Sequence, residues 1–188
     1  MLEPWVHKRL KEDIGMERYK HTLRVAEISK KLARKYGADE EKANIAALLH
    51  DCGKFQDKKN LLKVADDFDI ILDNVMKINK HLIHGPLGAE IAKRTYDVHD
   101  EEILSAIYYH TTGRENMSLL EKVIYMADYI EPGRDFKGLE EVRNLVDVDL
   151  NNALLLAMNN TIKYVIEKGY LLHIDTVKAR NSIKLEME

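Results

Sequence analysis

The chain has 188 residues, of which 45% are hydrophobic and 32% charged, and its net charge is −3. This balance is typical of a folded globular protein and excludes an intrinsically disordered chain. It also argues against a nucleic-acid partner, because a protein that binds nucleic acid needs a basic excess to neutralise phosphates.

Other sequence features indicate where the protein works. A single cysteine, Cys52, excludes an internal disulfide framework. No apolar run approaches the ~20 residues that span a bilayer, so we expect no membrane partner. The N-terminal stretch is charged throughout and lacks the apolar core of a signal peptide. We therefore expect a cytoplasmic protein.

Helix signals follow one another along the chain. Capping residues such as Asp39, Asp100, Asp149 and Asp175 precede segments of helical periodicity, and Ser118 opens a capping box. In chain order, the predicted helices cover residues 3–14, 16–36, 40–51, 61–68, 71–83, 84–96, 101–110, 119–131, 150–168 and 176–184. The sequence carries no strand alternation or hairpin signal. It therefore predicts an all-α fold of roughly ten helices.

Polar side chains interrupt several of the apolar segments. His21 shares one face of its helix with apolar residues at helical spacing. The segment 40–51 is apolar nearly all round, so we expect it to be the most buried helix, yet it ends in His50 and Asp51. Asp128 stands in the middle of an apolar run, where an uncompensated carboxylate would be costly. A buried carboxylate needs a partner, and a cation is the obvious one.

Six helix-borne residues are candidate metal ligands: His21, His50, Asp51, His84, His110 and Asp128. Any one of them alone would be interpreted more simply as a hydrogen-bonded core residue. Together they suit a metal site better, because the sequence offers no comparable set of buried basic partners. Imidazole and carboxylate donors suit iron, manganese or zinc, and the lack of a thiolate cluster argues against a structural zinc finger. Six donors are about right for two ions that share Asp51.

The order and spacing of these residues resemble a known family. His21, the pair His50-Asp51 and Asp128 resemble the H…HD…D signature of the HD-domain phosphohydrolases, and His84 and His110 resemble its two-metal branch. Six segments are similar, in order, to the bacterial symmetrical diadenosine tetraphosphatases: RYKHTLRVAE, AALLHDCGK, HGPLGAEIAKR, AIYYHTTGR, MSLLEKVIYMADYIEPGRDF and ALLLAMNNTIKYVIEKG. The resemblance runs from about residue 16 to residue 183.

This resemblance implies a fold, a reaction and a cofactor. The fold would be a single HD domain over residues 1–188, with its HD motif core at about 16–135 and C-terminal helices at about 138–185. The enzyme would hydrolyse diadenosine tetraphosphate to two ADP with two divalent metal ions, iron by resemblance, although manganese and zinc share this donor set. The resemblance is also compatible with a homodimer.

The resemblance assigns the six ligands to two ions. His21, His50, Asp51 and Asp128 would hold one ion, and Asp51, His84 and His110 would hold the other. Two such ions lower the pKa of a shared water, polarise a phosphoryl oxygen and align the phosphorus with the attacking oxygen. Asp51 and Lys54, the lysine that follows the HD pair, are therefore the expected catalytic residues.

Further residues are candidates for binding the substrate. They are Lys54, Arg24, Thr111, Thr112, Arg114, Arg134 and His81. Most are basic or lie next to a candidate ligand, and His81 could protonate a leaving phosphate. Each arginine could equally be an ordinary solvated surface charge. Most tyrosines at helical spacing are expected in the core, although one could stack on a base.

Two alternatives to this function stay open. The protein could be an HD phosphohydrolase that acts on another nucleotide, such as a nucleoside monophosphate or guanosine tetraphosphate. It could also be a nucleotide-binding regulator with little catalysis. The complete ligand set argues against the regulator, because a protein that does not catalyse has no need to keep every ligand.

Overall fold

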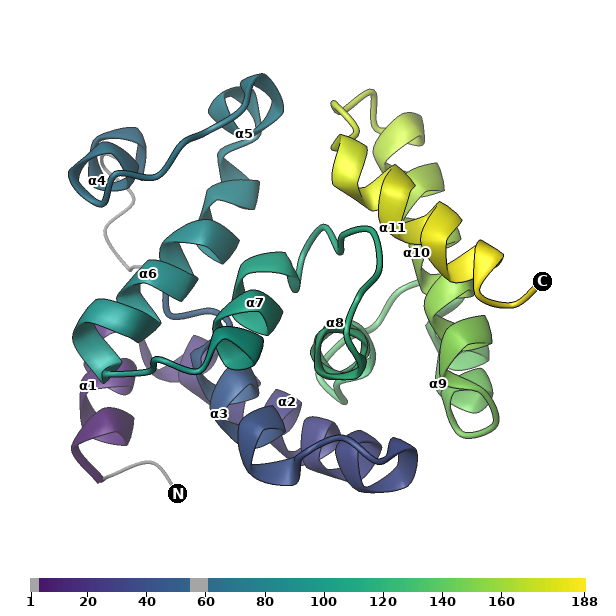
Figure 1. Ribbon diagram of the computed structural model, residues 1–188, viewed down its shortest axis with the longest axis horizontal. Helices are drawn as coiled ribbons and strands as arrows, with labels where there is room; N and C mark the ends of the chain where they lie inside the picture. Colours follow the sequence, from purple (N-terminus) through teal and green to yellow (C-terminus); the bar gives the residue numbers. More distant parts are fainter. Residues whose placement is uncertain (1–3, 55–60) are drawn as a thin grey trace.

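The computed structural model describes residues 4–54 and 61–188, and Figure 1 shows that these segments form helices joined by short connections. The α-helices are α1 (Pro4–Ile14), α2 (Met16–Tyr36), α3 (Glu40–Leu49), α4 (Leu61–Asp67), α5 (Asn74–Ile78), α6 (His84–Tyr96), α7 (Glu101–Tyr109), α8 (Leu119–Ile130), α9 (Leu139–Val146), α10 (Leu150–Glu167) and α11 (Ile174–Leu185), and η1 (Lys80–Ile83) is a 3₁₀ helix. The described residues contain no strand. The all-α prediction is confirmed, and none of the helices within these ranges is long and apolar enough to cross a membrane.

Most helices begin at the capping residues that the sequence predicts. The carboxylates of Asp39, Asp100 and Asp149 accept hydrogen bonds from the first free N–H groups of α3, α7 and α10. Ser118 and Glu121 form both halves of the capping box that opens α8. Each such cap stabilises a helix by about 1 kcal/mol. Local sequence therefore determines where these helices start.

Several helices differ from the prediction. The segment 71–83, predicted as one helix, is divided into α5 and the 3₁₀ helix η1. Helix α11 begins earlier than expected, because the Nδ1 atom of His173 accepts a hydrogen bond from the backbone N–H of Asp175 and takes the capping role assigned to Asp175. Helix α9 was not predicted at all. It has only eight residues, but Leu139, Val142 and Val146 share a face and are buried.

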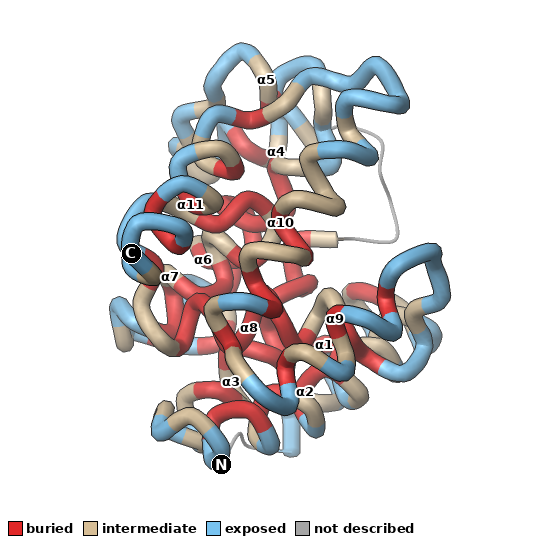
Figure 2. The backbone as a smooth tube through the Cα atoms, turned by 90° about the vertical axis from the view of Figure 1, so that its right-hand side faces the viewer, coloured by how far each residue is buried: buried red, intermediate tan, exposed pale blue. Residues whose placement is uncertain are grey.

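Helix α8 lies at the centre of the molecule. It contacts α2, α3, α7, α9 and α10, and Figure 1 shows it nearly end-on between α7 and the pair of α9 and α10. In Figure 2 the buried residues run through the middle of the molecule, while α4 and α5 project from it. Nine of the twelve residues of α8 are buried, against five of ten in α3. The prediction that α3 is the most buried helix is therefore wrong, because α8 has helices on more sides.

A close backbone approach brings the end of α3 against the start of α6. A Cβ atom at Gly53 would overlap the carbonyl oxygen of His84 and would lie 2.8 Å from the backbone nitrogen of Gly88. Only a glycine permits this contact. The approach sets His84 beside the residues that end α3.

Candidate metal centre

Three of the four candidate histidines are oriented by the main chain. His50 and His110 follow the last turns of α3 and α7, and His84 is the first residue of α6. The Nδ1 atom of His50 donates to the carbonyl oxygen of Ala47 at 2.6 Å, and Nδ1 of His110 donates to that of Ile107 at 2.7 Å. The Nδ1 atom of His84 donates to the carbonyl oxygen of His81. A carbonyl oxygen can only accept a hydrogen bond, so Nδ1 carries the proton. The Nε2 atom of the neutral ring then has a free lone pair.

The fourth histidine is oriented by a side chain. The Nδ1 atom of His21 lies 3.2 Å from Oε1 of Glu131, a carboxylate oxygen that accepts a hydrogen bond from it. When the ring is neutral and Nδ1 carries the proton, Nε2 has the lone pair and is directed away from Glu131. All four imidazoles therefore present the same kind of donor atom.

The four Nε2 atoms converge on one buried space. Nε2 of His21 lies 3.3 Å from Nε2 of His50, and Nε2 of His84 lies 2.9 Å from Nε2 of His110. Two lone pairs at this separation repel each other, because neither nitrogen has a proton to share. A cation bound between them would remove this repulsion.

Asp51 lies at the centre of the four imidazoles. Its Oδ1 atom is 3.6, 3.5 and 3.7 Å from the Nε2 atoms of His50, His84 and His110. Its Oδ2 atom is 3.9 Å from Nε2 of His21. The carboxylate is fully buried, and no residue that the structure describes donates a well-aligned hydrogen bond to Oδ1. Apart from the Lys54 ammonium at 2.8 Å, this oxygen faces imidazole lone pairs, which is the setting of a metal ligand.

Asp128 completes the set from α8. Its Oδ1 atom lies 3.1 Å from Nε2 of His21 and 3.9 Å from Nε2 of His50. The ligand atoms form three overlapping triplets within which all atoms lie within 4.8 Å of one another: His21, His50 and Asp51; His50, His110 and Asp128; and Asp51, His84 and His110. This donor set of nitrogen and oxygen atoms fits divalent transition-metal ions.

The protonation states of these groups also fit metal binding. Burial lowers the pKa of His50 and of His84, and it lowers the pKa of His110 to about 4. These rings are therefore neutral near pH 7. Burial alone would raise the pKa of Asp51, but the neighbouring His50 and Lys54 hold this pKa well below its ordinary value. The carboxylate is thus ionised, as a ligand must be.

Comparisons with known proteins agree with this geometry. A family model of the HD domain matches residues 18–133. The symmetrical bis(5'-nucleosyl)-tetraphosphatase of Halalkalibacterium halodurans is 40% identical over 179 residues, which cover 95% of each chain. The chain belongs to the HD-domain family, among its symmetrical bis(5'-nucleosyl)-tetraphosphatases.

Other relatives support this membership. A protein of the same name from Bacillus subtilis is 42% identical over 172 residues, 92% of each chain. The crystal structure of a predicted HD superfamily hydrolase involved in NAD metabolism, from Clostridium acetobutylicum, is 44% identical. It superimposes with a TM-score of 0.92 over 99% of this chain and 100% of its own. This HD-domain protein therefore shares its whole described fold with a solved relative.

Three of the predicted substrate-binding residues lie at the centre of this HD domain. The Nζ atom of Lys54 is 2.8 Å from Oδ1 of Asp51. The hydroxyl oxygen of Thr111 lies 3.0 Å from Nε2 of His110. Nη2 of Arg134 is 2.5 Å from Oδ1 of Asp128. These side chains surround the convergent donor atoms.

Two predicted arginines are already paired with buried carboxylates. The Nε atom of Arg24 donates to Glu131 at 2.5 Å. The Nε atom of Arg114 donates to Glu121 at 2.7 Å, and its guanidinium packs over the ring of Tyr109. Neither guanidinium is a free surface charge, so their predicted phosphate contacts must compete with these ion pairs.

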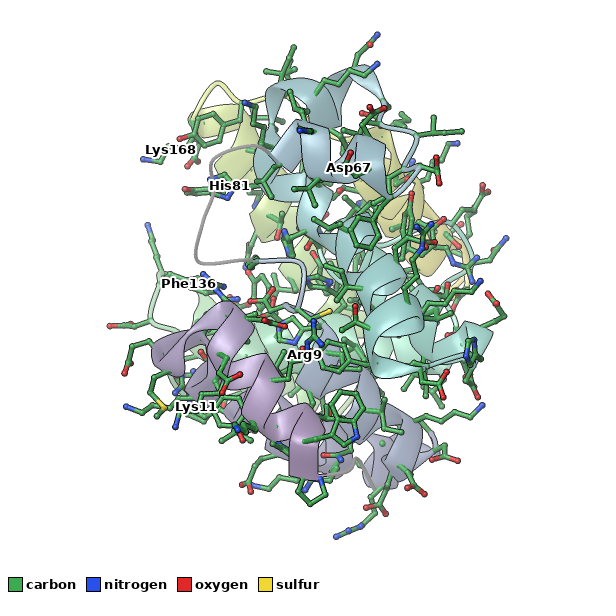
Figure 3. All side chains as sticks on the ribbon, turned by 90° about the vertical axis from the view of Figure 1, so that its left-hand side faces the viewer. Arg9, Lys11, Asp67, His81, Phe136 and Lys168 are labelled. Carbon is green, nitrogen blue, oxygen red and sulfur yellow. The ribbon has the colours of Figure 1, made fainter. Side chains whose placement is uncertain are left out.

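The remaining two predicted contacts have different surroundings. Thr112 is buried, and its hydroxyl donates to the carbonyl oxygen of Gly113, so the structure does not present it to a substrate. His81 is exposed, and Figure 3 shows it at the edge of the molecule. Its carbonyl oxygen, rather than its ring, contacts the candidate ligand His84.

Sequence reasoning missed two residues at the site. Nη1 of Arg18 lies 2.7 Å from Oδ2 of Asp51, and Glu131 contacts His21. Arg18 stands one helical turn before His21, and Glu131 stands one turn after Asp128. Such spacing from a candidate ligand is a signal that could have identified both residues.

A cavity of about 180 Å³ opens beside the donor atoms. Part of its lining belongs to the candidate centre, and part of it is aromatic. Tyr125 and Tyr129 are stacked with ring centroids 6.5 Å apart, and Phe136 meets Tyr129 edge-on at 5.2 Å. The residues that line the cavity are His110, Thr111, Tyr125, Asp128, Tyr129, Arg134, Phe136 and Thr161.

Proposed function

We propose that this protein hydrolyses diadenosine tetraphosphate symmetrically to two ADP, with two divalent metal ions. The observation that carries the proposal is the buried Oδ1 atom of Asp51, which faces three imidazole lone pairs without an aligned hydrogen-bond donor among the described residues. The names of the two tetraphosphatase relatives support the substrate. Iron is our proposed metal, and manganese and zinc are alternatives with the same donor preference.

We divide the ligands between the ions as follows. His21, His50, Asp51 and Asp128 would hold one ion, and Asp51, His84 and His110 would hold the other. The position of Asp51 supports its shared role, since its Oδ2 atom faces His21 and its Oδ1 atom faces His50, His84 and His110. When bound, two such ions supply Lewis acidity towards a phosphoryl oxygen and activate a water molecule for attack.

The cationic side chains around Asp51 would bind the phosphates. Lys54 and Arg18 contact Asp51 while their own side chains are 28% and 37% exposed, so both can reach outward. If Asp51 ligates metal, its negative charge is balanced and these cations become available to the substrate. Hydrolysis adds water across the central P–O–P bridge, and one ADP leaves on each side. Arg134 and Thr111 can orient the chain of phosphates.

The product distribution tests the proposal. Metal-loaded protein should convert diadenosine tetraphosphate to ADP alone. Formation of ATP and AMP would show asymmetrical cleavage and contradict the proposal. If the protein is inert towards this dinucleotide but hydrolyses a nucleoside monophosphate or guanosine tetraphosphate, the alternative HD phosphohydrolase is correct. Tight binding of the dinucleotide without turnover would indicate a regulator.

Lys54→Ala should slow hydrolysis or weaken substrate binding by about 10–100-fold, because a charge-assisted hydrogen bond contributes about 1.5–3 kcal/mol. The variant should still bind two metal ions per chain, since the ammonium group is not a ligand. Steady-state kinetics and elemental analysis measure the two quantities. Lys31→Ala, which removes an exposed lysine from α2, is the control. Loss of metal from Lys54→Ala would show that Lys54 supports the ligands instead.

The aromatic part of the cavity lining would receive a base of the substrate. Phe136→Ala should raise the KM for diadenosine tetraphosphate by about tenfold with little change in kcat, since stacking of one base contributes about 1–3 kcal/mol. Tyr164→Ala is the matched control, because Tyr164 is an exposed aromatic on α10 that does not line the cavity. An unchanged KM in Phe136→Ala would place the base elsewhere.

The proposed partner is thus a small dinucleoside polyphosphate. The net charge of −3 gives no reason to propose a nucleic-acid partner. A homodimer and a cytoplasmic location stay predictions from the sequence.

A further inference from the structure

We infer that Glu131 is a positioning residue for His21, and that Arg24 and Gly133 hold Glu131 in place. Glu131 fixes which nitrogen of His21 carries the proton and thereby directs the other nitrogen into the metal centre. The inference rests on the proposed role of His21 as a metal ligand. It assigns Arg24 a different role from the phosphate contact that the sequence predicts.

The position of His21 within its helix explains why it needs a side-chain partner. His50 and His110 lie just after helix ends, where carbonyl oxygens three residues earlier have no helical partner and can accept from Nδ1. His21 lies inside α2, where the carbonyl oxygens of the preceding turn are used by the helix itself. Among the four imidazoles, only His21 therefore depends on a side chain, and Glu131 supplies it at 3.2 Å.

Glu131 is held in a single orientation. Its side chain is 2% exposed. Oε2 accepts from Nε of Arg24 at 2.5 Å and from the backbone N–H of Gly133 at 2.7 Å, which leaves Oε1 facing His21. The backbone carbonyl of Glu131 accepts from Arg143 at 2.9 Å. A buried carboxylate with these partners cannot turn away from the imidazole without losing several hydrogen bonds.

Gly133 leaves room for the ion pair of Arg24 and Glu131. A Cβ atom at this position would lie 2.6 Å from Nη2 of Arg24 and 2.9 Å from Oε1 of Glu131. Any larger residue would therefore displace the pair. The turn after α8 thus serves the centre in two ways, because it carries Glu131 and leaves space for the arginine that holds it.

Loss of this support should affect one metal site and not the other. A carboxylate that accepts from a ligating imidazole orients the ring and raises its basicity, and its removal typically costs about 10–100-fold in metal affinity. His84 and His110 contact other partners, so the ion that they hold should be unaffected. A general loss of stability would weaken both sites together.

Competition titration of the metal-free full-length chain with Co²⁺ and a chromophoric chelator measures the two binding steps without any substrate. In Glu131→Ala, one step should weaken by at least about tenfold and the other should stay within about twofold. Glu131→Gln keeps the shape of the side chain and can still accept from His21, so it should recover part of the affinity. Equal affinities in wild type and both variants would overturn the inference, and so would an equal weakening of both steps.

Glu121→Gln is a matched control. Glu121 is 1% exposed and accepts from Nε of Arg114 at 2.7 Å, but it contacts no candidate ligand. Both Co²⁺ steps should be unchanged in this variant.

Gly133→Ala replaces Glu131→Ala in the test if Glu131→Ala does not fold. It leaves Glu131 and Arg24 present and only forces them apart. It should weaken the same single step, and unchanged steps in a folded Gly133→Ala would contradict the inference.

Arg24→Gln separates the two roles of this arginine. If Arg24 holds Glu131, the same Co²⁺ step should weaken in this variant. If it is only a phosphate contact, both steps should stay unchanged and the KM for the dinucleotide should rise, which would refute its positioning role. The titration needs no turnover, so failure of the proposed reaction would appear in the product assay while the binding steps still test Glu131.

Discussion

Asp51→Asn should abolish hydrolysis of diadenosine tetraphosphate and release both metal ions. Among the residues that the structure describes, only Asp51 has a carboxylate that faces His21 with one oxygen and His84 and His110 with the other. An asparagine has nearly the same shape but no charge, so the loss reflects ligation and not packing. We expect kcat/KM to fall by at least about 10³-fold, which corresponds to about 4 kcal/mol of transition-state stabilisation.

Elemental analysis of the purified variant, together with the product assay, measures both effects. Asp67→Asn is the control, since Asp67 is an exposed carboxylate at the end of α4. Figure 3 labels this residue. Two ions per chain in Asp51→Asn would refute the shared ligand. Removal of a buried negative charge alone would raise the free energy of unfolding. In this variant the gain should be small, because Arg18 and Lys54 lose the carboxylate that balances their charges.

Gly53→Ala should destabilise the protein by about 2–3 kcal/mol, the usual cost of forcing an extra group into a packed interior. The added Cβ would overlap the carbonyl oxygen of His84, so α6 must move away from the end of α3. Urea unfolding measures the change in the free energy of unfolding. Because His84 moves with α6, the variant should also bind the second ion more weakly.

Gly169→Ala separates steric overlap from backbone strain. Gly169 has a φ of 67° and no atom within 4 Å of its added Cβ, so alanine there should cost only about 1 kcal/mol from the left-handed conformation. If Gly53→Ala is no more destabilising than Gly169→Ala, the backbone contact between α3 and α6 is not tight.

Local rules account for much of the fold. The caps Asp39, Asp100 and Asp149 predict helix starts because the capping hydrogen bonds are made within three residues. The same locality explains why His50 and His110 could be placed at helix ends from their positions alone. The convergence of these residues could be anticipated only from their chemistry and from the family resemblance, since no periodicity relates one helix to another.

Contacts between distant segments could not be predicted in this way. Glu131 and Arg24 are separated by 107 positions and meet because α8 packs against α2. The sequence instead suggested that Arg24 faces a phosphate, since an arginine near a ligand is interpreted most simply as a free cation. The burial of α8 was underestimated for the same reason, because the number of neighbours around a helix is a property of the assembled fold.

The use of carbonyl oxygens to orient three imidazoles limits how the centre can be altered. Every residue type has a carbonyl group, so substitution of Ala47, His81 or Ile107 leaves the acceptor for His50, His84 or His110 in the chain. Among the four imidazoles, only His21 can therefore be tuned by substituting the residue that orients its ring. Random mutation is restricted in the same way. The orientation of His21 should therefore change more readily in evolution than the orientations of His84 and His110.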